Sequence, residues 1–144
     1  MQVANNVSNF IRFHHIGVAV KSFDKSIIYY KNLGYECSDI INDEIQNVEL
    51  VYCKSKTFPN VELIKPVNEN SPVYSILQKN DTQIYHQCYQ TKDLKKALEF
   101  LQRKNKIFCI SKPKTAILFN NKKVSFYQIP NVGLIEILEV ENYE

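Results

Sequence analysis

The chain has 144 residues, of which 44% are hydrophobic and 23% are charged, and these proportions are typical of one folded domain, here residues 1–144. No apolar run approaches the roughly 18 residues of a transmembrane helix, which excludes such a helix. The net charge of +3 is spread along the chain and only Arg12 and Arg103 are arginines, so no nucleic-acid interface is expected. The polar segment 1–10 lacks the apolar core of a signal peptide, and we expect a cytoplasmic protein that binds no membrane.

The four cysteines lie far apart in the sequence, and none belongs to a Cys-x-x-Cys pair. A zinc ribbon or a thioredoxin-type site is therefore not expected. The spacing favours reduced and mostly buried thiols. The residues are Cys37, Cys53, Cys88 and Cys109.

Residues 13–66 carry the pattern of a βαβββ module. The run 13–20 is rich in β-branched residues, which favours a strand. Ser22 then supplies a helix N-cap, an apolar stripe at helical spacing predicts a helix over 22–33, and Gly34 ends it. Three strand-like runs follow: 35–41, 48–54 and 61–65.

Residues 84–140 repeat this order, with His15 and His86 marking an offset of 71 positions. Their predicted elements are a strand over 85–90, a helix over 93–104 capped by Thr91 or Asp93, and strands over 106–110, 124–129 and 134–139. Between the modules, the linker 67–83 contains a short helix that Ser71 caps. We infer a tandem duplication, and hence an α+β fold in which two βαβββ modules form a curved mixed sheet.

Each module places one histidine and one glutamate inside apolar strands. A carboxylate within a β core is costly unless it is paired or binds a metal, and the duplicated positions indicate four side chains that converge. Imidazole nitrogens and carboxylate oxygens together suit a divalent Ni, Co, Zn, Mn or Fe ion. The expected ligands of one such ion are His15, Glu62, His86 and Glu136.

Several stretches resemble the vicinal oxygen chelate superfamily, and in particular its branch of glyoxalase I and methylmalonyl-CoA epimerase. The resemblance implies paired βαβββ modules around a metal cleft, and it carries the metal-ligand positions onto the same four residues. It covers almost the whole chain from Phe13 to Glu139. The stretches are residues 15–20, 30–35, 61–66, 70–72, 85–89, 122–126 and 133–139.

In this branch the common chemical step removes a proton from the carbon next to a carbonyl. The resemblance therefore implies a metal-dependent enzyme of the glyoxalase type, with a lactoylglutathione lyase-like isomerisation of a thiol hemithioacetal. Glu136 or Glu62 would serve as the catalytic base. The alternative is a methylmalonyl-CoA epimerase-like enzyme that acts on an acyl-CoA thioester. The substrate cleft is expected to contain Gly17, Cys88 and Phe126.

The sequence departs from the epimerase pattern at one position. Epimerases of this branch carry a proton-transfer glutamate in a Glu-x-Gly-Val stretch, and Ile45 occupies that place here, one or two residues after Asp43 and Glu44. The stretch 115–119 is also more apolar than the usual loop, which indicates an altered substrate lid.

Two other classes share this fold, namely metal-free proteins that sequester drugs and Fe(II) dioxygenases. A sequestering protein would have no reason to keep all four ligands. A dioxygenase site normally has three protein ligands, so Glu62 speaks against that class. A homodimer is expected, because relatives pair through module edges and few prolines protect the edge strands of this chain.

Overall fold

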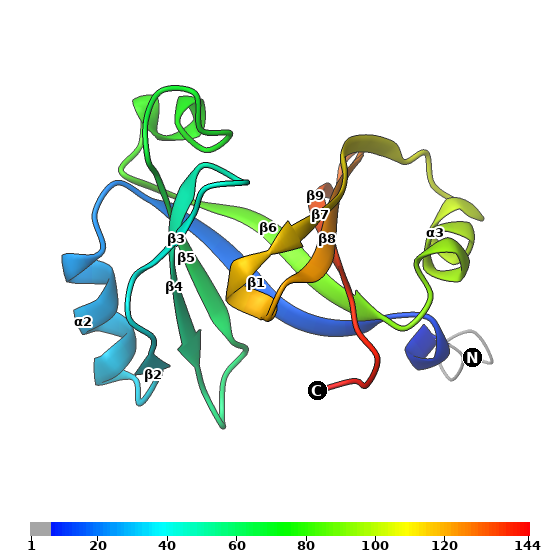
Figure 1. Cartoon of the computed structure of the whole chain (residues 1–144), viewed down its shortest axis with the longest axis horizontal. Coiled ribbons are helices and arrows are strands. Elements are labelled where there is room, and N and C mark those ends of the chain that lie inside the picture. The colour runs from blue at the N-terminus through cyan, green and yellow to red at the C-terminus, as the bar shows by residue number, and fades with distance from the viewer. Residues whose placement is uncertain (1–6) are drawn as a thin grey trace. The chain divides into compact units, whose positions relative to one another are not determined.

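The computed structural model describes residues 7–144 and divides them into two compact units (Figure 1). The first unit consists of residues 15–85 and 116–121, and the second consists of residues up to 14, 86–115 and 122–144. Strands β1 and β6 contribute residues to both units. Residues 1–6, which belong to the segment expected to lack a signal peptide, lie outside the described residues.

The first unit contains a mixed set of strands with one helix. Strand β1 pairs in parallel with β5, whereas β4 pairs antiparallel with β5, β2 and β3. The strand order is therefore β2-β4-β5-β1, with β3 beside β4. The elements are β1 (Arg12–Val20), α2 (Asp24–Asn32), β2 (Glu36–Cys37), β3 (Ile41–Asp43), β4 (Val48–Lys54), β5 (Val61–Pro66) and the 3-10 helix η2 (Ser75–Gln78).

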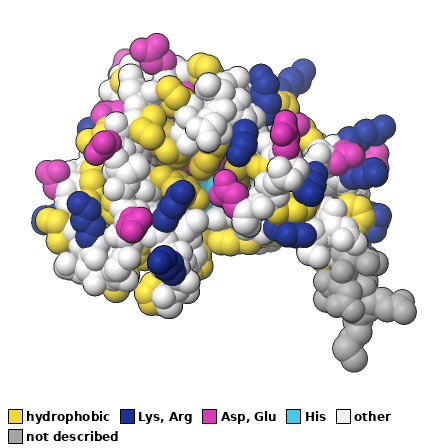
Figure 2. All heavy atoms as spheres, turned by 60° about the horizontal axis from the view of Figure 1, so that its bottom comes forward, with side chains coloured by type: hydrophobic (Ala, Val, Ile, Leu, Met, Phe, Trp, Pro, Cys, Tyr) yellow, Lys and Arg dark blue, Asp and Glu magenta, His cyan; other side chains and the backbone are white. Residues whose placement is uncertain are grey.

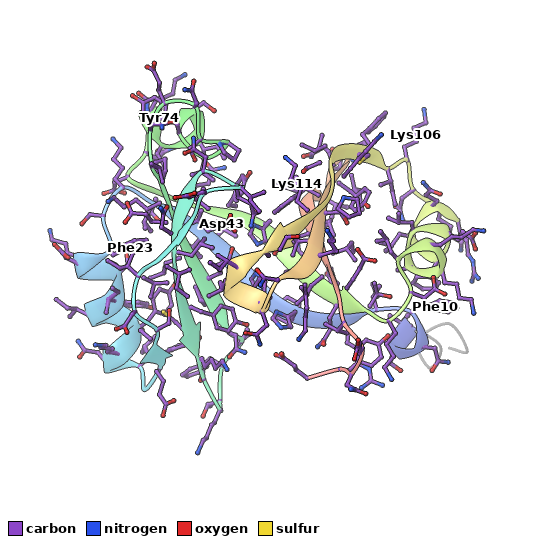
Figure 3. All side chains as sticks on the ribbon, in the orientation of Figure 1. Phe10, Phe23, Asp43, Tyr74, Lys106 and Lys114 are labelled. Carbon is purple, nitrogen blue, oxygen red and sulfur yellow. The ribbon has the colours of Figure 1, made fainter. Side chains whose placement is uncertain are left out.

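Helix α2 covers one face of these strands. Phe23 (labelled in Figure 3), Ile27 and Tyr30 pack against buried apolar side chains of β1, β4 and β5, among them Leu63. The opposite face carries a second cluster of buried residues. Its members are Ala19, Val48, Leu50, Ile64, Val73 and Leu77. Because strand side chains alternate, Glu62 points away from α2, on the same side as this second cluster.

The second unit repeats this plan. Strand β6 pairs in parallel with β9, β9 pairs antiparallel with β8, and the order is β6-β9-β8-β7. Leu94, Leu98 and Leu101 of the helix pack against Ile135 and Ile137, so alternation directs Glu136 away from that helix. The elements are η1 (Val7–Asn9), β6 (Thr82–Thr91), α3 (Leu94–Gln102), β7 (Phe108–Ala116), β8 (Lys122–Ile129) and β9 (Gly133–Glu139), whereas the 3-10 helix η3 (Ile117–Phe119) between β7 and β8 belongs to the first unit.

These elements confirm the predicted α+β fold, with two differences in the first unit. Helix α2 begins at Asp24 rather than at Ser22. Its N-cap is Phe23, which makes no side-chain capping bond. The predicted strand over 35–41 is two short strands, β2 and β3. Gly34 ends the helix as predicted, with a φ of 90°.

The second unit and the linker also differ in detail from the prediction. Asp93 caps α3 as predicted and accepts a hydrogen bond from the Lys96 backbone N–H at 3.1 Å. Strand β7 runs over Phe108–Ala116 rather than 106–110, so it takes in the beginning of the expected lid. The linker helix is a 3-10 turn that begins at Ser75, because the Ser71 hydroxyl has no hydrogen-bond partner among the described residues and does not act as a cap.

Neither α-helix in residues 7–144 combines the length and the apolar character that crossing a membrane requires. On the face that Figure 2 shows, lysine and arginine side chains lie among acidic and hydrophobic ones. No single sign of charge dominates that face.

Candidate functional site

In the first unit, the structure brings His15 of β1 next to Glu62 of β5. His15 is 0% exposed and Glu62 is 4% exposed. The His15 Nε2 and Glu62 Oε2 atoms lie 3.7 Å apart. The parallel register pairs Gly17, two residues after the histidine, with Glu62, and this places both side chains on the face away from α2.

The second unit contains the equivalent pair, His86 of β6 and Glu136 of β9. Both residues are 2% exposed, and the His86 Nε2 and Glu136 Oε1 atoms lie 3.1 Å apart. The register again pairs the glutamate with the residue two positions after the histidine, which here is Cys88. The two modules therefore build the same local geometry from different parts of the chain.

An aromatic side chain accompanies each pair. Tyr52 is the antiparallel partner of Glu62, and its ring meets the His15 ring edge-on at 5.6 Å and 86°. Phe126 is the antiparallel partner of Glu136, and its ring meets the His86 ring edge-on at 5.6 Å and 80°. Sequence reasoning singled out Phe126 but missed Tyr52. An alignment of the later strands at the offset that relates Glu62 to Glu136 pairs these two aromatic residues and would have found it.

The donor set in each unit fits a divalent metal. An imidazole and a carboxylate that are both removed from water carry a desolvation cost, which an ion pair or a shared cation offsets. All four side chains, His15, Glu62, His86 and Glu136, offer a suitable ligand atom. Nitrogen and oxygen donors of this kind suit transition metals such as Zn, Ni, Co, Mn and Fe.

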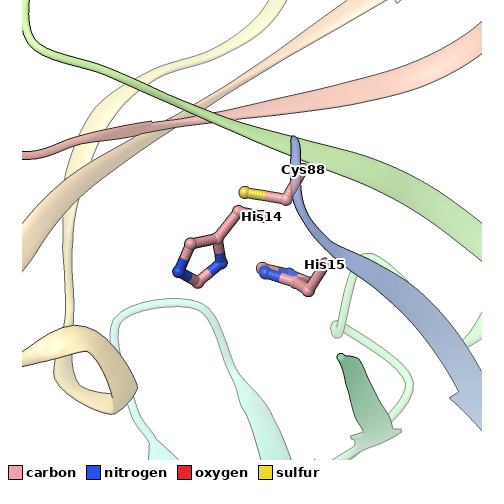
Figure 4. A group of neighbouring side chains, drawn as sticks. All are labelled: His14, His15 and Cys88. Atoms are coloured by element: carbon pink, nitrogen blue, oxygen red, sulfur yellow. The ribbon is translucent and has the colours of Figure 1, made fainter. Parts of the chain in front are cut away.

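His14 is a further buried histidine that sequence reasoning missed. Figure 4 shows it beside Cys88, with His15 as the next residue of β1. Its Nε2 atom lies 3.1 Å from Glu144 Oε2, and burial lowers the pKa of His14, whereas the Glu144 carboxylate opposes that change. Strict alternation would bury only one of two successive residues, but His14 and His15 are both buried, so their positions could not be read from the strand pattern.

The residues expected to form the substrate cleft adjoin these pairs within their own units. Gly17 lies opposite Glu62 on the neighbouring strand, and Cys88 lies opposite Glu136. Phe126 contacts the His86 ring. Their contact with a substrate stays a prediction.

The hairpin between β3 and β4 holds the position where the epimerase glutamate was sought. Ile45 is 60% exposed and Glu44 is also exposed, whereas Asp43 is 2% exposed (Figure 3). The Asp43 carboxylate accepts hydrogen bonds from the Gln46 backbone N–H at 3.0 Å and from the Gln46 Nε2 at 2.7 Å. The buried carboxylate of this hairpin is therefore Asp43, and its two bonds to Gln46 close the turn.

Known proteins share this sequence pattern and fold. The sequence profile of the Glyoxalase/Bleomycin resistance protein/Dioxygenase superfamily matches residues 14–126. Human mitochondrial methylmalonyl-CoA epimerase is 30% identical over 105 residues, which are 72% of this chain and only 59% of the human protein. An ethylmalonyl-CoA/methylmalonyl-CoA epimerase of Cereibacter sphaeroides is 30% identical over 95 residues, which are 63% of this chain and 69% of the relative.

Among solved structures, a variant of Streptomyces coelicolor methylmalonyl-CoA epimerase in complex with 2-nitronate-propionyl-CoA superimposes with a TM-score of 0.72. The superposition covers 92% of this chain and 99% of that chain at 20% sequence identity. At this identity the match demonstrates a shared fold.

Proposed function

The chain belongs to the Glyoxalase/Bleomycin resistance protein/Dioxygenase superfamily, and we propose that it is a metal-dependent epimerase of an acyl-CoA thioester. The observation that carries this proposal is the repeated, buried pair of one histidine and one glutamate. The relatives with epimerase activity support the acyl-CoA substrate. The glyoxalase-type isomerisation that the sequence favoured uses the same proton-transfer chemistry, but these relatives lend it no specific support.

In this proposal both pairs bind one divalent ion, so that His15, Glu62, His86 and Glu136 are its ligands. The His–Glu pair of each unit supplies two donors, and the two equivalent halves of the duplicated chain together supply four. When bound, the ion supplies positive charge that stabilises the charge developing on a carbonyl oxygen. Metal analysis of the purified protein would identify the ion among Ni, Co, Zn, Mn and Fe.

The protein's own carboxylates would move the proton. Epimerisation requires that the α-proton leaves one face of the carbon and that a proton arrives at the opposite face. Glu62 and Glu136 come from different modules, and each is almost completely removed from water. In this proposal Glu136 or Glu62 takes up the α-proton as a general base.

The test compares two substrates on the metal-loaded protein in deuterated water. We expect deuterium to enter the α-carbon of methylmalonyl-CoA, together with interconversion of its two epimers. The hemithioacetal of methylglyoxal and glutathione should not be converted. Conversion of the hemithioacetal alone would establish the glyoxalase-type reaction, and tight binding of small molecules without bound metal or exchange would establish a sequestering protein.

We also propose a homodimer that forms through β7. This strand ends the order of its unit and is nine residues long, and Phe108 and Ile110 on it are 54% and 61% exposed. The first half of β7, before Lys112 and Pro113, presents backbone groups and apolar side chains that a second copy could pair with.

A further inference from the structure

Two cysteines that are 16 positions apart in the sequence meet across β2 and β4 of the first unit. Cys37 is the antiparallel partner of Cys53, and their Sγ atoms lie 3.0 Å apart. The next pair along the ladder is hydrogen-bonded, since the Ser38 N–H donates to the Tyr52 carbonyl at 2.8 Å. Cys37 and Cys53 therefore form a non-hydrogen-bonded pair, in which Cα atoms lie about 4.5 Å apart, at the short end of the distances that a disulfide spans.

The two thiols differ in their surroundings. Cys53 is 0% exposed and packs beside Val51 and Leu63 in the cluster under α2, whereas Cys37 is only partly buried. Burial raises the pKa of Cys53, and the neighbouring Cys37 raises it further. Cys37 is thus the thiol that a soluble reagent reaches first, and Cys53 is placed to react with the Cys37 sulfur afterwards.

We propose that Cys37 and Cys53 form a redox-active dithiol, which a low-molecular-weight disulfide such as oxidised glutathione converts into a disulfide between β2 and β4. In the first step the Cys37 thiolate attacks one sulfur of the reagent, forms a mixed disulfide and releases one thiol. In the second step Cys53 attacks the Cys37 sulfur and releases the second thiol. The two cysteines lose two electrons and two protons, and the reagent gains them as two thiols.

The new bond would close the segment 37–53, which contains β3 and the hairpin that Asp43 stabilises. A cross-link across a segment of this length reduces the freedom of the unfolded chain. The cross-link also holds Cys53, the residue after Tyr52, and the Tyr52 ring contacts the His15 ring. Oxidation should therefore stabilise the first unit next to its His–Glu pair.

The experiment counts thiols after equilibration with mixtures of reduced and oxidised glutathione. We expect the number of titratable thiols to fall from four to two, and the protein mass to fall by two hydrogens, with one peptide linking Cys37 to Cys53. The melting temperature should rise by roughly 5–10 °C on oxidation. Because Cys109 is exposed and the neighbouring strand β8 contains no cysteine, Cys109→Ser is the matched control and should keep the full response.

Cys37→Ser and Cys53→Ala should each abolish the internal link and the gain in melting temperature. Four thiols that persist under fully oxidising conditions would overturn the proposal. A stable glutathione adduct on Cys37 that never resolves would also overturn it, because it would show that Cys53 cannot reach the mixed disulfide. Neither outcome depends on the epimerase assay, so this proposal and the proposed function fail separately.

Discussion

The Nε2 atom of His86 lies 3.1 Å from the Oε1 atom of Glu136, and both side chains are almost completely buried. A charge in such a position is tolerated only when its partner remains, and the loss of one member of a buried pair typically costs about 3–5 kcal/mol. The pair is also two of the four donors of the proposed metal site. Metal affinity and stability should therefore respond to the same side chains.

The first prediction concerns metal binding by His86→Ala. The variant removes one nitrogen donor, and we expect the affinity for Zn²⁺, Ni²⁺ or Co²⁺ to fall by more than about 100-fold, beyond the effect of groups that only support ligands. Equilibrium dialysis with metal analysis measures this change. Glu49→Gln is the control, because Glu49 forms a partly exposed ion pair with Lys65 between β4 and β5 and is not a proposed ligand. Equal metal affinity in the wild type and His86→Ala would show that His86 is not a ligand.

The second prediction concerns stability with and without metal. An ion that binds only the folded chain stabilises it by about 2.7 kcal/mol at a concentration 100 times its dissociation constant. We therefore expect chelation to lower the melting temperature of the wild type and metal addition to restore it. The double variant His15→Ala with His86→Ala should show no such response in scanning calorimetry. A metal-dependent shift that persists in the double variant would place the bound ion elsewhere.

The sequence predicted the four buried polar side chains because each interrupts an apolar strand, and the repeat related them. Strand β4 over Val48–Lys54 was also predictable from its β-branched and aromatic residues. The prediction that Ser22 caps the helix was wrong. A serine can cap a helix, but the N-cap of α2 is Phe23, whose ring packs in the core under the helix.

The features that the sequence did not predict depend on contacts between segments that are distant in the chain. The break between β2 and β3 lies where the Ser38 hydroxyl accepts a hydrogen bond from the Tyr52 N–H at 2.9 Å. Strand β7 pairs with β8, which follows it in the chain, so its length could not be read from its own residues. The role of Tyr52 beside His15 required the register of β4 on β5. Such pairings are tertiary, and local propensity does not determine them.

The third prediction concerns the hairpin between β3 and β4. Asp43→Ala removes both hydrogen bonds from Gln46 and leaves its partly buried N–H without this acceptor, which should reduce the free energy of unfolding by about 1–3 kcal/mol. Glu44→Ala, one residue along and exposed, should change it by less than about 0.5 kcal/mol. Urea denaturation measures both values. Equal stability of the two variants would mean that the Asp43 bonds do not hold the turn.

The fourth prediction concerns the oligomeric state. We expect sedimentation equilibrium to give twice the chain mass of 16.8 kDa at micromolar concentration. Ile110→Lys places a charge on the exposed edge of β7 and should shift the equilibrium to the monomer without loss of metal. Lys25→Glu, a charge change on α2, is the control and should leave the dimer intact. A monomeric wild type with a full complement of metal would exclude a dimer.

The last prediction concerns the residue that moves the proton. On the expectation that Ile45 takes the place of the epimerase glutamate, Ile45→Glu should add to the rate of epimerisation, whereas Glu44→Ala, at an exposed position, should leave the native reaction largely intact. Glu136→Gln removes both a metal ligand and the proposed base, and we expect turnover to fall by more than the ~10²–10⁴-fold that the loss of a general base causes. Deuterium exchange at the substrate α-carbon, measured beside metal content, separates the three variants. Loss of exchange in Glu44→Ala with its metal retained would place the base in the hairpin before β4, and Glu136 would then act as a ligand alone.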